Sequence, residues 1–263
     1  KSAGSLLSAH LARLQELLAG CVEPELYEFP LAAAHRSAEK AARLEVFHEP
    51  EADESYYLVV DGSMGIADED GVVDGSAKGR DPSAIHVYAR RRPRLCAVYE
   101  GYLVPQVVGR LGAKVARMYG EVLVDVEDQG GYGEAVLIGF RDEGWQRFVM
   151  REKRQAQGGG VVRAYGFKTD SVTRALYIGA VQEQVLHGGI EVRSRRVVKS
   201  ALGMRVDNNG KILARSGLHD EHVMLWGRAA HWMGLPANAP RSRTVTPLTG
   251  RRGMFDELRK DVE

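Results

Sequence analysis

Acidic side chains stand at the ends of three predicted elements, where they could together hold divalent metal ions. Asp61 and Glu127 each end a short apolar run that is typical of a buried strand. Asp220 and Glu221 stand at the start of the last predicted helix. Clustered carboxylates repel one another unless a cation lies between them, and oxygen ligands with few histidines suit Mg2+ or Mn2+. Two such ions could activate a water and stabilise the leaving oxygen in phosphodiester hydrolysis, so the pattern indicates a nuclease.

Each of these residues also has a purely structural interpretation. Asp61 could end its strand in a turn, and Asp220 could cap its helix. Asp125 shares a strand face with Glu127 by the period of two, and could be solvated or support a ligand instead of binding metal. His219 is a candidate for metal or phosphate contact. We therefore keep Asp125 and His219 as secondary candidates.

Three strand-forming runs, a helix and a fourth strand must position these carboxylates. The runs at 56–60, 84–89 and 95–99 predict an antiparallel three-stranded meander. Apolar residues at steps of three and four over 107–118 predict a helix, long enough to bring the strand at 122–127 back parallel to the first strand. This is the element order of the ribonuclease-H-like fold. We therefore expect an α/β protein with a mixed sheet, the meander plus parallel strands, flanked by helices.

Downstream of these elements the sequence predicts a helix over 171–187, a strand at 190–192 and a hairpin over 204–213. A final helix follows Gly217. The hairpin is expected near the candidate site.

The length of 263 residues suits one large domain with extensions. Residues 1–50 are predicted to be mostly helical, with a second, Ala-rich helix over 31–44, and to form a linker or the remnant of a preceding domain. Residues 51–235 are predicted to form the nuclease domain. Residues 236–263 are rich in Pro, Arg, Ser and Thr, and we expect a flexible C-terminal tail.

Composition excludes several classes of protein. The chain is 44% hydrophobic and 27% charged, as expected of a globular protein with a sizeable core. No apolar run approaches the length that spans a bilayer, and two distant cysteines favour a reduced cytosolic protein over a secreted one. No Gly-x-x-x-x-Gly-Lys-Ser/Thr phosphate loop occurs, so ATPase motifs are absent from this chain.

The net charge is only +1, from 36 basic and 35 acidic residues, but the basic residues are bunched in runs. Lys and Arg in such runs could neutralise the DNA backbone without reading its sequence, although a charge run is also typical of a solvated surface. The segregation of charge is therefore compatible with DNA binding despite the near-neutral sum.

Several motifs also stand in a recognisable order. They are Tyr57–Gly62, Arg80–Ile85, Val124–Glu127 followed by Gly130–Gly133, Tyr165–Thr169, Asp207–Lys211 and Gly217–Met224. In this order they resemble the nuclease domain of the large terminase subunit of tailed bacteriophages. The resemblance covers about residues 45–235.

The resemblance implies an enzyme that cuts concatemeric double-stranded DNA during genome packaging, with two Mg2+ or Mn2+ ions held by Asp61, Glu127 and Asp220. It places Asp81 near the site as a secondary candidate. The family's closing motif usually reads His-Asp-Asp, whereas its third position here is Glu221. Either Asp220 or Glu221 is therefore expected to be the direct ligand.

The resemblance also implies partners and a location. It implies double-stranded DNA, a portal protein and a small terminase subunit as partners, no membrane, and assembly in the host cytoplasm. The basic residues nearest the implied site are the candidate DNA contacts: Lys168, Arg193, Arg195 and Arg196.

Three other interpretations remain open at this stage. A Holliday-junction resolvase or transposase-like nuclease would share the fold and the metal chemistry, but the closing His-Asp-Glu motif and the hairpin favour the terminase interpretation. A sugar kinase or actin-like ATPase also opens on a strand followed by Asp-Gly, yet it needs a second phosphate loop for which Gly130–Gly133 is a poor candidate. A catalytically dead module that binds DNA or the capsid is the third.

Overall fold

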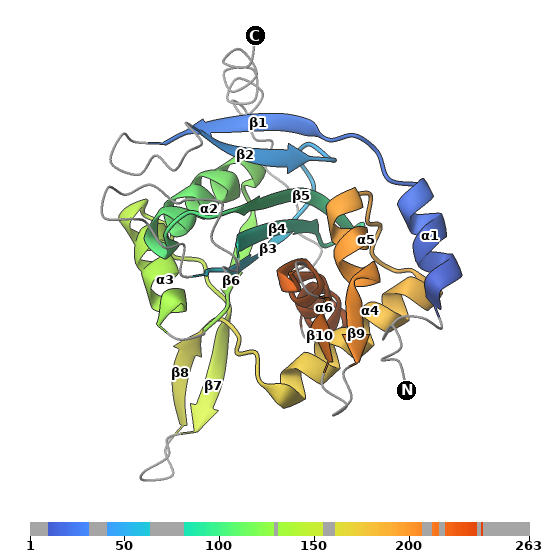
Figure 1. Cartoon of the computed structure of the whole chain (residues 1–263). Coiled ribbons are helices and arrows are strands. Elements are labelled where there is room, and N and C mark those ends of the chain that lie inside the picture. Colours follow the sequence, from blue (N-terminus) through green and yellow to red (C-terminus); the bar gives the residue numbers. More distant parts are fainter. Residues whose placement is uncertain are drawn as a thin grey trace.

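A six-stranded mixed sheet forms the centre of the protein, seen in a computed structural model that describes residues 10–31, 41–63, 82–128, 131–154, 161–206, 212–215, 219–235 and 238. The strands are β1 (Glu25–Pro30), β2 (Ala41–Val46), β3 (Tyr56–Asp61), β4 (Ser83–Ala89), β5 (Arg94–Gly101) and β6 (Val122–Val126). They lie in the order β1-β2-β5-β4-β3-β6 (Figure 1). Neighbouring strands are antiparallel, except that β3 and β6 are parallel.

Helices cover both faces of this sheet, and two small hairpins extend from it. The helices are α1 (Leu11–Ala19), α2 (Pro105–Tyr119), α3 (Tyr132–Asp142), α4 (Ser171–His187), α5 (Arg195–Leu202) and α6 (Glu221–Gly234). The hairpins pair β7 (Met150–Arg154) with β8 (Val161–Tyr165) and β9 (Met204–Val206) with β10 (Ile212–Ala214). No helix in the described ranges is long and apolar enough to span a membrane.

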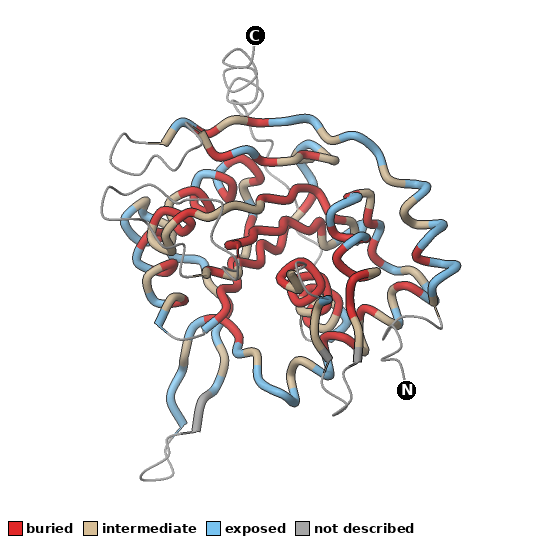
Figure 2. The backbone as a smooth tube through the Cα atoms, viewed as in Figure 1, coloured by how far each residue is buried: buried red, intermediate tan, exposed pale blue. Residues whose placement is uncertain are grey.

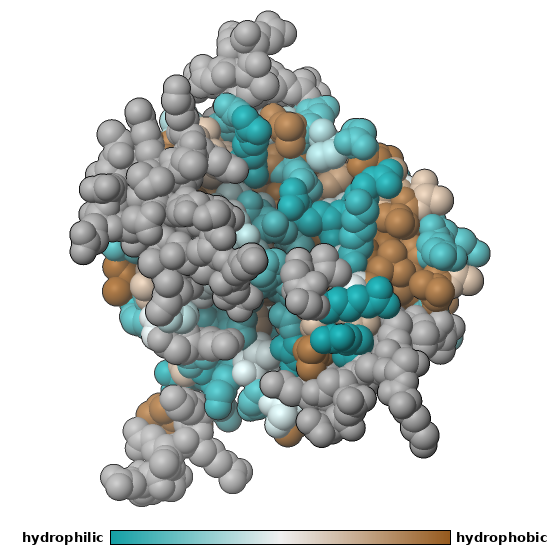
Figure 3. Space-filling model, viewed as in Figure 1, coloured by the Kyte–Doolittle hydropathy of each residue, from teal (hydrophilic) through white to brown (hydrophobic). Residues whose placement is uncertain are grey.

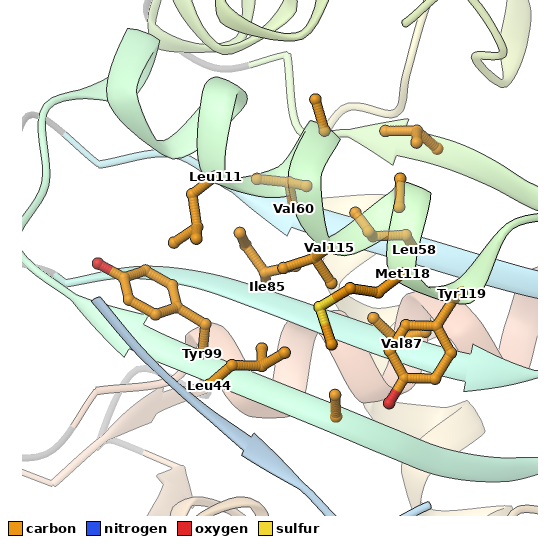
Figure 4. Close-up of a cluster of buried hydrophobic side chains, with 14 of the residues drawn as sticks. Leu44, Leu58, Val60, Ile85, Val87, Tyr99, Leu111, Val115, Met118 and Tyr119 are labelled. Atoms are coloured by element: carbon orange, nitrogen blue, oxygen red, sulfur yellow. The ribbon is translucent and has the colours of Figure 1, made fainter. Parts of the chain in front are cut away.

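Two hydrophobic cores, one on each face of the sheet, hold the layers together. Figure 2 shows that the buried residues gather along the central strands and on the helices around them. β3 reads as an unbroken apolar run because its side chains alternate between the two cores: Leu58 and Val60 join one core, and Tyr57 and Val59 the other. On the first face, Leu111, Val115 and Met118 of α2 pack over the strands (Figure 4). On the second face, α6 lies against β3 and β4, with α4 and α5 packed beside it.

The parallel pairing of β3 with β6 decides where the candidate site lies. Val60 is paired with Val126, and the backbone N–H of Glu127 donates to the carbonyl of Val60 at 2.9 Å. The ends of both strands therefore lie side by side at one edge of the sheet. Asp61 is the last residue of β3, so it lies next to Glu127 on the α6 face.

The sequence-based fold class is confirmed. The structure contains the antiparallel meander β3-β4-β5, the helix predicted over 107–118 as part of α2, and the parallel fourth strand. The helix predicted over 171–187 is α4, both arms of the predicted hairpin over 204–213 form, and α6 is the final helix. The tip of that hairpin lies outside the described residues.

The helical prediction for residues 1–50 is wrong over most of its described part. Only α1 is helical there, whereas β1 and β2 are strands, and β2 falls where an Ala-rich helix was expected over 31–44. The buried residues of β2 are Ala42, Leu44 and Val46, a period-two pattern that the small alanines conceal, and pairing with β5 decides the conformation. These strands are part of the central sheet and not of a helical linker. The other domain limits stay predictions, and residues 236–263, apart from Asn238, lie outside the described residues.

Three further elements were not predicted, and one predicted strand is reduced to a single bridge. α3, the β7–β8 hairpin and α5 have no counterpart in the sequence-based scheme. The strand expected at 190–192 forms only one bridge, between Glu191 and Arg94.

A glycine contact sets how closely α6 packs on α4. A Cβ atom at Gly227 would lie 2.3 Å from the carbonyl oxygen of Tyr177, a backbone atom that cannot rotate away. Gly227 therefore allows α6 to approach α4 backbone to backbone. By contrast, a Cβ atom at Gly179 of α4 would meet nothing within 4 Å.

We expect Gly227→Ala to lower the free energy of unfolding by about 1–3 kcal/mol, because the added methyl forces the two helices apart. Gly179→Ala in the same helix pair is the matched control, and should raise it by roughly 0.5–1 kcal/mol through helix propensity alone. Urea denaturation of both variants measures the difference. Equal effects would contradict a close contact between α4 and α6 at Gly227.

Candidate metal centre

Four carboxylates converge where β3, β6 and α6 meet. Asp61 ends β3, Glu127 directly follows β6, and Glu221 is the first residue of α6 with Asp220 at its N-cap. Glu127 and Glu221 are only 4% and 5% exposed, and Asp61 is half-buried. The structure thus brings together the three carboxylates assigned to metal binding, and Glu221 with them.

Crowding among these groups keeps a proton in the site when no cation is present. Burial raises the pKa of Asp61 well above its ordinary value, and the negative charges of Glu127, Glu221 and Asp220 raise it further. Burial also raises the pKa of Glu127, while the neighbouring Thr169 side chain and Arg174 act to lower it. A hydrogen bond between the Asp61 and Glu127 carboxyl groups also acts to raise the pKa of Asp61 and to lower that of Glu127.

These residues fit a divalent cation. Buried like charges must be neutralised by protons or by a cation, and the donors are all carboxylate oxygens, the ligands that Mg2+ and Mn2+ prefer. Among the described residues, however, no three Asp, Glu, His or Cys side chains are already arranged around one point as ligands. Asp220 forms an ion pair with Arg174 of α4 instead. The carboxylates that would bind a metal ion are therefore close together, but they do not yet surround a common point.

The segment before α4 is fastened to the end of β6, and this places Lys168 and Thr169 beside Glu127. The N–H of Phe167 donates to the carbonyl of Val126 at 3.0 Å, and the N–H of Asp128 donates to the carbonyl of Phe167 at 2.6 Å. Gly166 has φ +71°, and a Cβ atom there would lie 1.9 Å from the carbonyl oxygen of Val126. Only glycine permits this approach.

α4 begins directly after this segment with a reciprocal cap. The Asp170 side chain accepts from the N–H groups of Val172 and Thr173, and the Thr173 hydroxyl accepts from the N–H of Asp170. This cap fixes the first turn of α4, which carries Arg174, near the carboxylates.

Asp125, two residues before Glu127, ties α6 to the sheet. It is fully buried, and it pairs with Arg228 of α6 at 2.7 Å while accepting a hydrogen bond from the Tyr57 hydroxyl. The Arg228 guanidinium also lies over the Phe167 ring at 5.1 Å. Asp125 is therefore not solvated, and its role as a support for a metal ligand stays a prediction.

A second buried contact anchors the first turn of α6. His222 Nδ1 lies 2.8 Å from His86 Nε2 of β4, and His222 Nε2 lies 2.5 Å from a Glu100 oxygen of β5. The secondary candidate His219 lies 3.8 Å from Glu221, measured from Nδ1 to Oε1. Asp81, the other secondary candidate, lies outside the described residues.

Three of the four candidate DNA contacts fall into two places. Lys168 is exposed beside Glu127. Arg195 and Arg196 line a cavity of about 650 Å3 between α5 and strands β1 and β2, which His219 and His222 also line. In Figure 3, hydrophilic side chains gather over β2 and α5 in this region. Arg196 is paired with Glu45 and Glu100, and Arg193 with Glu191. Within the described ranges, no acidic side chain forms an ion pair with Arg195.

Four residues at or near the site were missed from the sequence. Tyr57 and Thr169 fall within motifs that the sequence analysis quotes but were given no role, and Arg174 and Arg228 fall outside those motifs. The role of each comes from contacts across the fold.

We expect Asp61→Asn to stabilise the metal-free protein at neutral pH. The pKa of Asp61 is higher in the folded than in the unfolded protein, so protonation stabilises the fold at acidic pH, and this contribution is lost as pH rises through the folded-state pKa. Asn mimics the protonated form, so the advantage of the variant should grow from pH 5 to pH 7.5 and reach on the order of 1 kcal/mol. Urea denaturation in EDTA at both pH values measures the difference in free energy of unfolding between the variant and the wild type. If this difference became smaller as the pH rises, the crowding of carboxylates around Asp61 would be contradicted.

We expect Asp125→Asn to cost stability without removing a metal ligand. The substitution leaves the Arg228 guanidinium buried without its counter-charge, which should lower the free energy of unfolding by about 3–5 kcal/mol. Metal affinity, measured by calorimetry below the melting temperature, should change by no more than a few fold. A complete loss of metal binding in a folded variant would instead identify Asp125 as a ligand.

Comparison with known proteins shows which fold this site belongs to. No family model matches the sequence, and no curated protein sequence matches it. The crystal structure of the large terminase nuclease from thermophilic phage G20c with bound magnesium matches with a TM-score of 0.50 at 15% identity, over 83% of this chain and 96% of that chain. The cobalt-bound form of the same nuclease gives the same values. The chain therefore has the mixed α/β, ribonuclease-H-like fold of terminase nuclease domains.

Proposed function

We propose that this chain is a metal-dependent endonuclease that cuts concatemeric double-stranded viral DNA during genome packaging. The observation that carries the proposal is the convergence of four carboxylates from β3, β6 and α6 at one end of the sheet. The fold shared with terminase nucleases supports it, as do the structures of such a nuclease with bound magnesium and cobalt. The motif order described above supports the terminase assignment.

Asp61, Glu127 and either Asp220 or Glu221 would hold two ions, Mg2+ or Mn2+. Such ions supply an activated water and stabilise the leaving oxygen of a phosphodiester. The protein's own contribution is to keep the carboxylates close together through the pairing of β3 with β6 and the anchoring of α6. A bound cation would favour the ionised form of Asp61, because its charge would offset the repulsion among the carboxylates.

DNA phosphates would be bound by cations at the two places already described. Lys168 is suited to a phosphate next to the carboxylates, because the backbone ties of Phe167 hold this segment beside Glu127. Arg195 is suited to a phosphate farther along the backbone, with Arg196 lining the same cavity. Arg193 would contact DNA from the neighbouring cavity that it lines beside α1. Such contacts neutralise charge without reading sequence, so we expect weak sequence specificity.

The family resemblance extends the proposal to the protein's surroundings. We propose that the chain acts in the host cytoplasm, together with a portal protein and a small terminase subunit. We propose no ATPase role for it, because the sequence contains no phosphate-loop motif.

Incubation with supercoiled plasmid in Mg2+, Mn2+ or EDTA tests the nuclease. We expect nicked and linear products with either metal and none in EDTA. Glu127→Gln should slow cutting by roughly two orders of magnitude or more, a loss typical of removing a group that stabilises the transition state. Glu121→Gln is the matched control, because Glu121 is exposed and paired with Arg147 outside the cluster.

Equal cutting in EDTA, or undiminished cutting by Glu127→Gln, would overturn the mechanism. A four-way junction cut in preference to linear duplex would favour a resolvase. ATP hydrolysis by the purified chain would favour a kinase-like or actin-like function, and metal binding without any cutting would favour a module that only binds DNA.

A further inference from the structure

Arg174 is a cation placed inside the acidic site, and the sequence motifs do not account for it. It lies in the first turn of α4 and forms an ion pair with Asp220, and both side chains are about one-quarter exposed. Its charge also acts on Glu127, whose pKa it lowers. Arg174 is thus close to carboxylates from two of the three elements that build the site.

The surrounding backbone holds this arginine in place. The N–H of Arg174 donates to the carbonyl of Asp170 at 2.8 Å, and the reciprocal cap between Asp170 and Thr173 closes the same turn. One side of the turn is fastened to β6 through Phe167, and the body of α4 is pressed on α6 at Gly227. Arg174 therefore stays beside Asp220 because of the fold and not because of the ion pair alone.

The ion pair gives Asp220 two competing uses. A carboxylate engaged by a guanidinium is less available to a metal ion, and a metal ion bound nearby repels the guanidinium. A guanidinium that loses its carboxylate inside a half-buried site needs another anion, and its planar fork suits a phosphate. The DNA phosphate at the proposed nuclease site is the anion available there.

We propose that Arg174 is an exchangeable counter-ion: it neutralises Asp220 in the metal-free protein, and binds the DNA phosphate once Asp220 turns to a metal ion. This rests on the proposed function for the identity of the substrate. The exchange couples the two binding events, so that metal strengthens DNA binding and DNA strengthens metal binding by the same factor. Arg174 then prevents tight metal loading until the substrate is present.

Calorimetric titration with Mn2+ in the absence of DNA tests the first half. Because the guanidinium no longer competes for Asp220, Arg174→Gln should bind Mn2+ several-fold more tightly than the wild type, on the order of five- to tenfold. Arg174→Lys keeps the charge and should stay within about twofold of the wild type. Arg110→Gln is the matched control, because Arg110 is paired with Asp142 on the opposite face of the sheet. An arginine that merely supported the fold would instead give weaker Mn2+ binding when removed.

Binding of a short DNA duplex in Ca2+ and in EDTA, at one fixed salt concentration, tests the second half. Ca2+ should tighten DNA binding by the wild type and by Arg110→Gln, and this gain should fall several-fold in Arg174→Gln, with partial rescue in Arg174→Lys. In Mn2+ the Gln variant should cut more slowly although it holds the metal more tightly.

The outcomes separate this proposal from the nuclease proposal. Wild-type protein that binds Mn2+ but cuts nothing would overturn the nuclease, while the Mn2+ titrations would still decide whether Arg174 competes for Asp220. Unchanged or weaker Mn2+ affinity in a folded Arg174→Gln, or an undiminished Ca2+ effect on its DNA binding, would overturn the exchange.

Discussion

The rest of the structure depends on the parallel pairing of β3 with β6. This pairing forces the last side chains of both strands to the same edge, so Asp61 and Glu127 lie together whether or not their charges favour it. The helix α2 makes the parallel return possible, and its apolar face supplies the core beneath both strands. Hydrophobic burial on both faces of the sheet therefore offsets the electrostatic cost of placing these carboxylates together.

Buried ion pairs and hydrogen bonds hold α6 in place against the repulsion among the carboxylates. Arg228 with Asp125 fastens the middle of the helix, and His222 with His86 and Glu100 fastens its first turn. These contacts lie on the same helix as Glu221 but make no use of the site carboxylates. The start of α6, which carries Asp220 and Glu221, is therefore held in position by contacts that do not depend on a bound cation.

The order of β5, β4, β3 and β6 could be predicted, and acidic residues at the ends of β3 and β6 could be recognised, because local patterns mark these elements. The apolar run of β3, the spacing within α2 and the acidic residue after β6 are each visible within a few residues. β2 could not be predicted, since Ala42 hides its alternation and only pairing with β5 reveals it. The role of Arg174 could not be predicted either, because its partner Asp220 is 46 positions away and meets it only when α4 packs on α6.

The outer strand of the sheet has a consequence for how the protein behaves at high concentration. β1 pairs with β2 on one side, and no strand in the described ranges pairs with its other side. An open strand edge is a template for self-association through the backbone. β1 carries Glu25 and Glu28 and ends at Pro30, which lacks an N–H group. Glu28 is paired with Arg43 of β2, so the charge of Glu25 and the missing donor of Pro30 are the features that discourage a second chain from extending the sheet.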